Sequence, residues 1–169
     1  NPDDRLSGPL PPMTVAARVD RLREAIDAED LDALLVTDLT NVRYLSGFTG
    51  SAARLVVTAD AMLLVTDGRY AVQAPEEVAT AGVDAEVEVA STLADQDAAL
   101  SARAGSGRLG LEAASITWAA QRRITEEPWT AEPVATTGLV EAVREVKDDG
   151  ELARSARAAA IADAALATV

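Results

Sequence analysis

The sequence predicts an α/β fold in which a mixed β-sheet with one antiparallel hairpin lies between helical layers. Helical and β-type hydrophobic patterns alternate along most of the chain, as they do when helices cover a sheet. In the middle, residues 54–58 and 62–66 are β-type runs separated only by residues 59–61, which is typical of an antiparallel hairpin. The chain has 169 residues, 49% of them hydrophobic, which is enough for the core of one domain.

Before the hairpin, hydrophobic spacing defines the elements. The leader, residues 1–12, is rich in proline, so we expect it to be disordered or extended. A helix over residues 14–29 is predicted by four apolar residues at helical spacing, namely Val15, Val19, Leu22 and Ile26. The continuous apolar run at residues 33–37 suits a strand covered on both faces. Residues 38–50 are expected to form a loop with a short helix.

After the hairpin, a helix is expected from about Arg69, with Pro75 kinking or interrupting it and Gly82 ending it. Residues 84–90 alternate valine with acidic residues, as an edge strand does. A helix over residues 93–104 follows. We interpret the acidic residues of this region as a solvated face rather than a cation site; they are Glu76, Glu77, Asp84, Glu86 and Glu88.

The last part of the chain contains two short strands and three helices. The strands are expected at residues 108–112 and 131–136, and a helix capped by Ser115 is expected between them. On that helix Trp118 is expected in the core, whereas Trp129 follows a proline in a loop and is expected to be partly exposed. Further helices are predicted over residues 139–146 and after residue 147.

Domain boundaries follow from these elements. We expect a disordered leader at residues 1–13, a domain over residues 14–147, and a linker helix with the start of a further domain at residues 148–169. Asp148 and Glu151 have the spacing of a capping box that opens this last helix. The sequence ends within the helix, without a capping glycine or proline, so we expect the chain to continue.

Composition excludes several functions. The net charge of −13 argues against nucleic acids and anionic membrane surfaces as partners, because both bind basic clusters. No apolar run approaches the ~18 residues that cross a bilayer, and no signal-peptide pattern is present, so a cytoplasmic protein is expected. Without cysteine or histidine the usual catalytic triads and most catalytic zinc sites are excluded. Spacing alone defines no catalytic residue and no metal ligand.

Two segments concentrate the residue types that bind ligands or partners. Residues 40–51 contain Tyr44, and Phe48 between Gly47 and Gly50. Residues 66–70 place Arg69 and Tyr70 where a strand ends and a helix begins. Because the two segments flank one hairpin, we expect them to lie close together. Two interpretations stay open. In the first, Tyr44 and Phe48 pack the loop against the sheet, and Asp67, Arg69 and Tyr70 form a local cap and ion pair. In the second, these side chains face a substrate or partner.

The same segments resemble a known family. Residues 41–51 (NVRYLSGFTGS), a hairpin, and residues 66–74 (TDGRYAVQA) are similar to the N-terminal domain of the creatinase/prolidase/aminopeptidase P family. Residues 109–112 and 139–147 match the same family pattern, and residues 157–163 resemble the first helix of its catalytic half. The resemblance extends from about residue 14 to the end of the sequence.

The resemblance implies a mixed-sheet domain with RNase H-like topology that is not catalytic itself. It implies a parent metallopeptidase whose separate catalytic domain holds two divalent metal ions (Mn, Co or Zn) and hydrolyses proline-containing peptides. The N-terminal domain would pair with its own catalytic domain and a second copy of the chain, and would wall the active-site mouth. By motif, the residues for this role are Tyr44, Phe48, Arg69 and Tyr70. The alternatives are a dimerisation or binding module of a non-peptidase or catalytically altered member, and the N-terminal domain of a creatinase-like amidinohydrolase.

Overall fold

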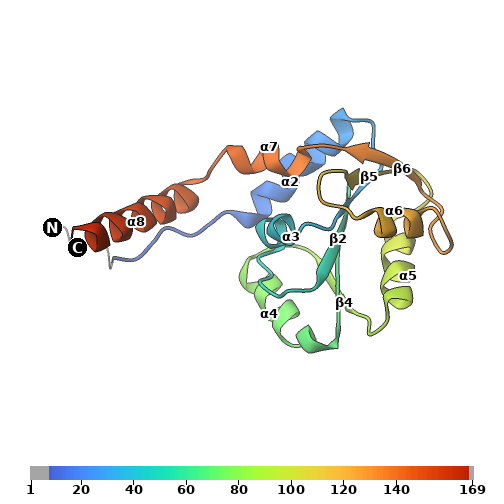
Figure 1. Ribbon diagram of the computed structural model, residues 1–169, viewed down its shortest axis with the longest axis horizontal. Helices are drawn as coiled ribbons and strands as arrows, with labels where there is room; N and C mark the ends of the chain where they lie inside the picture. Colours follow the sequence, from blue (N-terminus) through green and yellow to red (C-terminus); the bar gives the residue numbers. More distant parts are fainter. Residues whose placement is uncertain (1–7, 168–169) are drawn as a thin grey trace. The chain divides into compact units, whose positions relative to one another are not determined.

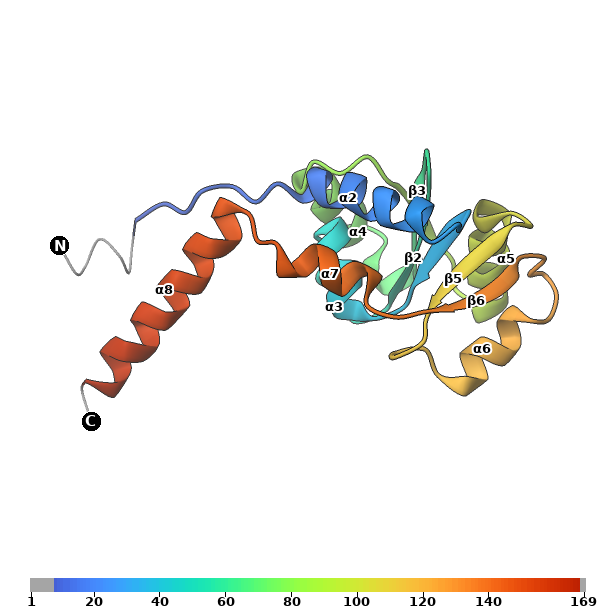
Figure 2. The same cartoon turned by 90° about the horizontal axis from the view of Figure 1, so that it is seen from above.

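Six strands form one mixed sheet, in the order β4-β3-β2-β1-β5-β6. The structure is a computed structural model that describes residues 8–167. In chain order the strands are β1 Ala33–Val36, β2 Ala53–Thr58, β3 Met62–Thr66, β4 Glu86–Val89, β5 Arg108–Glu112 and β6 Glu132–Thr136. The predicted hairpin consists of β2 and β3, which pair antiparallel with Leu55 opposite Leu64. Helices lie on both faces of this sheet (Figures 1 and 2), which confirms the predicted fold class.

The central strand β1 is buried on both faces. All four of its side chains are 0% exposed, as the continuous apolar run predicts. It pairs antiparallel with β2 and parallel with β5. The sheet therefore has a second antiparallel pair, β1–β2, in addition to the predicted hairpin. Sequence does not reveal this pair, because a strand, a helix and a strand in succession fit a parallel crossover equally well.

Four helices cover one face of the sheet: α2 (Val15–Ala28), α3 (Leu39–Ser46), α4 (Gln73–Thr80) and α7 (Leu139–Glu145). They pack against Leu34 and Val36 of β1 and against their neighbours in β2 and β3. The helix expected from Arg69 forms in two pieces, a 3-10 turn at Gly68–Tyr70 followed by α4. Pro75 lies in the first turn of α4, where its missing N–H costs no helical hydrogen bond.

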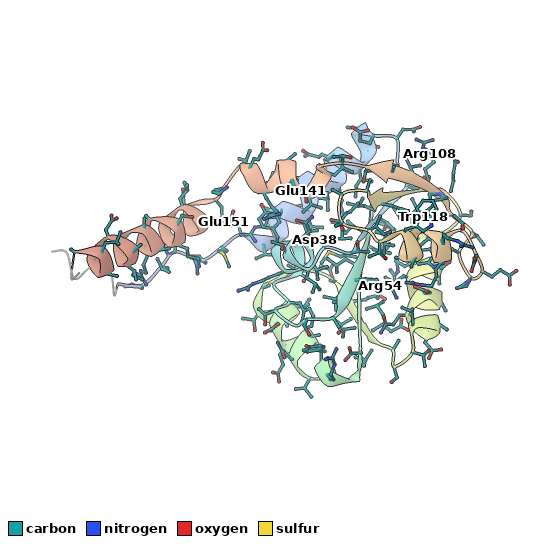
Figure 3. All side chains as sticks on the ribbon, viewed as in Figure 1. Asp38, Arg54, Arg108, Trp118, Glu141 and Glu151 are labelled. Atoms are coloured by element: carbon teal, nitrogen blue, oxygen red, sulfur yellow. The ribbon has the colours of Figure 1, made fainter. Side chains whose placement is uncertain are left out.

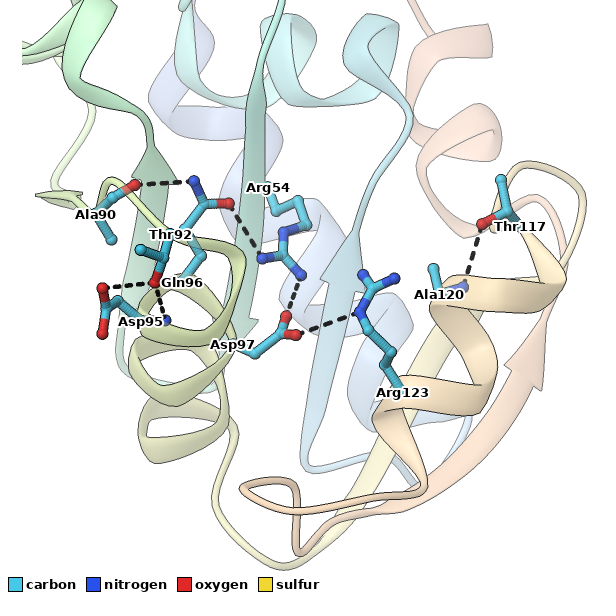
Figure 4. A network of polar contacts seen from close by, with 9 residues as sticks. All are labelled: Arg54, Ala90, Thr92, Asp95, Gln96, Asp97, Thr117, Ala120 and Arg123. Carbon is cyan, nitrogen blue, oxygen red and sulfur yellow. Dashed lines mark hydrogen bonds and ion pairs between the residues drawn. The ribbon is translucent and has the colours of Figure 1, made fainter.

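The opposite face is covered by α5 (Leu93–Ala104) and α6 (Trp118–Ile124). A buried carboxylate joins these helices to the sheet (Figure 4). Asp97 Oδ1 accepts from Nη1 of Arg54 on β2 at 2.5 Å, and Oδ2 accepts from Nε of Arg123 on α6 at 3.4 Å. Gln96 accepts from the second terminal nitrogen of Arg54 at 3.2 Å. Because Asp97 is buried, its two guanidinium partners are what makes its charge tolerable there.

The two tryptophans occupy the opposite environments from those expected. Trp118 is 77% exposed at the start of α6 (Figure 3), whereas Trp129 is 6% exposed and packs in the core beneath α5 and α6. For Trp118 the reason is where α6 begins: Thr117, not Ser115, is the N-cap, and its side chain accepts a backbone N–H of the first turn. With this start, α6 buries only Ile124.

The chain divides into two compact units. One is Val15–Val143, and the other combines the leader up to Thr14 with the segment from Arg144 onward, including α8 (Asp149–Leu166). The predicted capping box is present at the start of α8: Asp148 Oδ1 accepts from Glu151 N at 2.8 Å, and Glu151 Oε2 accepts from Asp148 N at 3.0 Å. The predicted leader lies partly outside the described residues, and its described part has no regular secondary structure. No helix within residues 8–167 is long and apolar enough to cross a membrane.

We predict that truncating the hairpin core destabilises the domain strongly. Leu64 is fully buried in β3, so Leu64→Ala should lower the free energy of unfolding by about 2–5 kcal/mol through lost burial and a cavity. The matched control is Val72→Ala, at an exposed position, which should change it by no more than about 0.5 kcal/mol. Urea unfolding followed by circular dichroism measures both. Equal effects of the two substitutions would contradict the buried hairpin.

Candidate functional site

The first of the two candidate segments begins with helix α3, which is fixed at both ends. Asp38 is its N-cap, and the carboxylate accepts from the backbone N–H groups of Thr40 and Asn41 at 2.8 and 3.2 Å. Gly47 ends the helix in the left-handed conformation, with φ of 77°. A side chain at this position would meet Ala81 of the neighbouring segment at 2.6 Å. The glycine therefore both stops α3 and allows the following loop to approach α4 closely.

The loop after α3 meets the 3-10 turn after β3 in an aromatic corner, which we define as Phe48, Gly50, Ser51, Arg69 and Tyr70. The rings of Phe48 and Tyr70 lie edge to face with centroids 5.2 Å apart. A Cβ on Gly50 would lie 2.1 Å from the Phe48 ring and 2.8 Å from the Tyr70 ring, so only glycine fits there. The two segments are thus close together, as their position around one hairpin predicts.

Tyr70 is held in the aromatic corner by Ser51. The phenol oxygen accepts from Ser51 N at 3.0 Å and lies 2.8 Å from the Ser51 hydroxyl. These side-chain and backbone hydrogen bonds lower the pKa of Tyr70 below its ordinary value. The ring rests on Phe48, which is only 1% exposed. Phe48 therefore acts as an internal support, and Tyr70 forms the partly exposed surface above it.

Arg69 is an exposed charged group of the aromatic corner. Its side chain is 67% exposed, and its guanidinium carbon lies 5.3 Å from the centre of the Tyr70 ring. Nε and Nη2 donate to the two carboxylate oxygens of Asp67 at 3.0 and 2.7 Å. This hydrogen bonding lowers the pKa of Asp67 and raises that of Arg69. The pair is exposed, so its effect is to orient Arg69 rather than to stabilise the fold.

A carboxylate on α4 fixes the outer side of the loop. Glu77 accepts from the backbone N–H and the hydroxyl of Thr49, both at 2.7 Å, and from Gln73 at 3.1 Å. Burial raises the pKa of Glu77, but these hydrogen bonds outweigh it and leave the pKa lowered. From the sequence, Glu77 is expected on a solvated acidic face. The hydrogen bonds by which Glu77 holds the loop cannot be predicted from residue spacing, because Thr49 lies 28 residues away in the sequence.

Tyr44, the remaining candidate, does not join the aromatic corner. It is buried, its hydroxyl donates to the Val143 carbonyl at 3.1 Å, and the Arg18 guanidinium lies 4.2 Å from the centre of its ring. These contacts connect α3 to α7 and α2. The structure therefore brings Phe48, Arg69 and Tyr70 together and places Tyr44 in the packing between helices.

A separate cavity of about 130 Å³, with a mixed polar and apolar lining, lies at the carboxyl ends of β1, β5 and β6. The carboxylates of Glu112 and Glu141 in its lining accept hydrogen bonds from other residues of the domain. Glu112 Oε2 accepts from the backbone N–H groups of Thr37 and Asp38 at 2.6 and 2.8 Å. The fully buried Asn41 donates to Glu112 Oε1 and to Glu141 Oε1, each at 2.7 Å. Within residues 8–167 no group of three or more histidine, cysteine, aspartate or glutamate side chains could hold a metal ion.

Fold and site together define an α/β domain with a braced aromatic corner on its surface. The profile of the Creatinase/Prolidase N-terminal domain family matches residues 18–146. The chain therefore belongs to this family.

Individual relatives agree with this assignment. The N-terminal domain of the cytoplasmic peptidase PepQ from Mycobacterium tuberculosis H37Rv is 40% identical, with a TM-score of 0.65 over 76% of this chain and 99% of that one. The Xaa-Pro dipeptidase from Bacillus anthracis is 30% identical, with a TM-score of 0.73 over 82% of this chain and 38% of that one. The uncharacterized peptidase YqhT of Bacillus subtilis (strain 168) is 33% identical over 86% of this chain. The chain spans 40% of the length of YqhT.

We predict that Gly50→Ala disrupts the aromatic corner. The added methyl group overlaps both rings, so the free energy of unfolding should fall by about 1–3 kcal/mol. Displacing Tyr70 from Ser51 should also return the pKa of Tyr70 towards its ordinary value in an ultraviolet titration. Gly68→Ala is the control, since a Cβ there meets no atom within 4 Å, and we expect a change of no more than about 0.5 kcal/mol. Indistinguishable results for the two variants would rule out the close packing at Gly50.

Proposed function

We propose that this chain is the non-catalytic N-terminal domain of a cytoplasmic, metal-dependent Xaa-Pro peptidase. Two observations support the proposal: the chain belongs to the family, and its relatives include peptidases. A third is that the chain matches only 40% of the length of YqhT. The catalytic domain of the parent polypeptide would hold two divalent metal ions and act on proline-containing peptides. The domain would contribute by pairing with a second copy and by forming part of the wall of the active-site mouth.

The observation that favours this role most is the construction of the aromatic corner. Arg69 is exposed but oriented by Asp67 and by the Tyr70 ring, and Tyr70 is fixed in turn by Ser51 and Phe48. Arginine and tyrosine are among the residues that most often anchor interfaces. A surface whose side chains are already ordered loses little conformational entropy when a partner or substrate binds. In this proposal Arg69 and Tyr70 make the contact.

The other two motif residues contribute from inside the domain. Phe48 supports Tyr70 from below, and Tyr44 ties α3 to the helices beside it. Their burial favours the packing interpretation for both residues. They would act on a mouth or an interface only by holding α3 and its loop in place.

We expect the 169-residue chain alone to be inactive towards Xaa-Pro peptides. The reason is that a metal-activated hydroxide needs several convergent ligands, and residues 8–167 offer no such group. Purified chain supplemented with Mn²⁺, Co²⁺ or Zn²⁺ is assayed for release of proline from an Xaa-Pro dipeptide. Turnover above buffer that a chelator abolishes would overturn the non-catalytic assignment.

We further predict weak self-association through the aromatic corner. The net charge of −13 opposes pairing at low salt, so screening should strengthen it. Arg69→Ala should weaken the association, whereas Arg122→Ala, which removes the same charge from an exposed position on α6, should not. Sedimentation velocity across a salt series measures this. A monomer at every salt concentration, or equal effects of both variants, would remove the support for a dimer role of this corner.

A further inference from the structure

Two arginines on one side of α8 bind the backbone of the leader. Arg154 donates from Nη1 to the Pro11 carbonyl at 2.8 Å, and Arg157 donates from Nη2 to the Gly8 carbonyl. The two carbonyls are three residues apart in the leader, and the two arginines are three residues apart in α8. The two segments therefore run antiparallel, with the later arginine of α8 bound to the earlier residue of the leader.

The beginning of α8 continues the same set of contacts. Asp148 Oδ2 accepts from the backbone N–H and the hydroxyl of Thr14, at 3.0 and 3.1 Å. Gly150, the second residue of α8, is buried, and a Cβ there would lie 2.4 Å from the Pro12 carbonyl oxygen. Glycine is a weaker helix former than alanine, so a close backbone contact is a physical reason for glycine at this position. The leader backbone passing over this position supplies that reason.

We propose that this side of α8, formed by Asp148, Gly150, Arg154 and Arg157, is a binding face for extended, proline-containing segments, and that the chain's own leader occupies it. We call it the α8 face. Residues 8–14 of the leader bind the α8 face of the same chain.

The chemistry of the contacts explains the preference for such segments. Both arginines donate to main-chain carbonyls. The α8 face therefore recognises the backbone conformation of the bound segment rather than its side chains. Prolines at positions 9, 11 and 12 restrict the leader to extended conformations and remove N–H groups that would need partners of their own. Arg157 also keeps a buried Nε that has no hydrogen-bond partner among the described residues. This nitrogen is an unused donor for a carbonyl of a bound segment.

Tethering makes the leader a strong competitor for the α8 face. A covalently linked segment acts at an effective concentration of about millimolar, so a free peptide must exceed that concentration or meet a chain without its leader. The α8 face is therefore self-occluded. Any partner that uses it must first displace residues 8–14.

Whether Gly150→Ala makes tryptic cleavage of α8 faster or slower tests this inference. If Gly150 were only a helix residue, alanine would strengthen α8 and slow tryptic cleavage after Arg154 and Arg157. If the leader packs over it, alanine displaces the leader, and cleavage at both sites should become about 30- to 150-fold faster, as expected for the joint loss of two or three hydrogen bonds. Ser155→Ala is the control, at an exposed position of the same helix, and should slow cleavage or leave it unchanged.

A second measurement tests peptide binding directly. A chain that begins at Thr14 should show the same faster cleavage as Gly150→Ala, and a synthetic peptide of residues 8–13 at about millimolar concentration should restore protection. The same peptide with its three prolines replaced by alanine should protect less.

Three results would overturn the proposal. The first is slower cleavage in Gly150→Ala. The second is a leader-deleted chain that the peptide does not protect. The third is protection of the intact chain that depends on protein concentration, which would place the leader of a second copy on the α8 face.

Discussion

Exclusion of water from both faces of β1 is the constraint on which the rest of the sheet domain depends. A four-residue strand whose side chains are all 0% exposed needs an apolar layer above and below it, and its backbone needs a neighbouring strand on each side. Alternate side chains supply the two cores: Leu34 and Val36 meet α2 and α3, and Ala33 and Leu35 meet the layer beneath α5. Just after the carboxyl end of the strand, the backbone N–H groups of Thr37 and Asp38 donate to Glu112, which ties this end of β1 to β5.

Features set by neighbouring residues could be predicted from the sequence. The hairpin, the buried strand, the amphipathic helix and the capping box each depend on residues within one short window, and the structure confirms them. Features set by distant residues could not. The direction of β2 relative to β1 depends on the course of the chain after α3, and the exposure of Trp118 depends on a helix that begins two residues later than expected.

The candidate site shows the same division. Sequence brought Phe48, Arg69 and Tyr70 into one region because a hairpin joins their segments, and the structure places them in contact. The residues that hold them are ordinary in sequence terms. The sequence around Ser51 and Glu77 carries no pattern that marks either residue as a support for the corner, and Glu77 simply follows another acid, Glu76, on α4. Their roles follow only from which backbone groups come within reach after folding.

Because the two tryptophans have opposite surroundings, the tryptophan fluorescence of the domain can report whether it is folded. They are the only two in the chain, and one indole faces solvent while the other is enclosed. Emission from Trp118 should resemble that of a free indole in water whether the domain is folded or not. A shift of the spectrum to longer wavelength on unfolding would therefore come from Trp129 and would report the opening of the core beneath α5 and α6. Quenching by a small water-soluble molecule would instead report Trp118 and anything that covers α6.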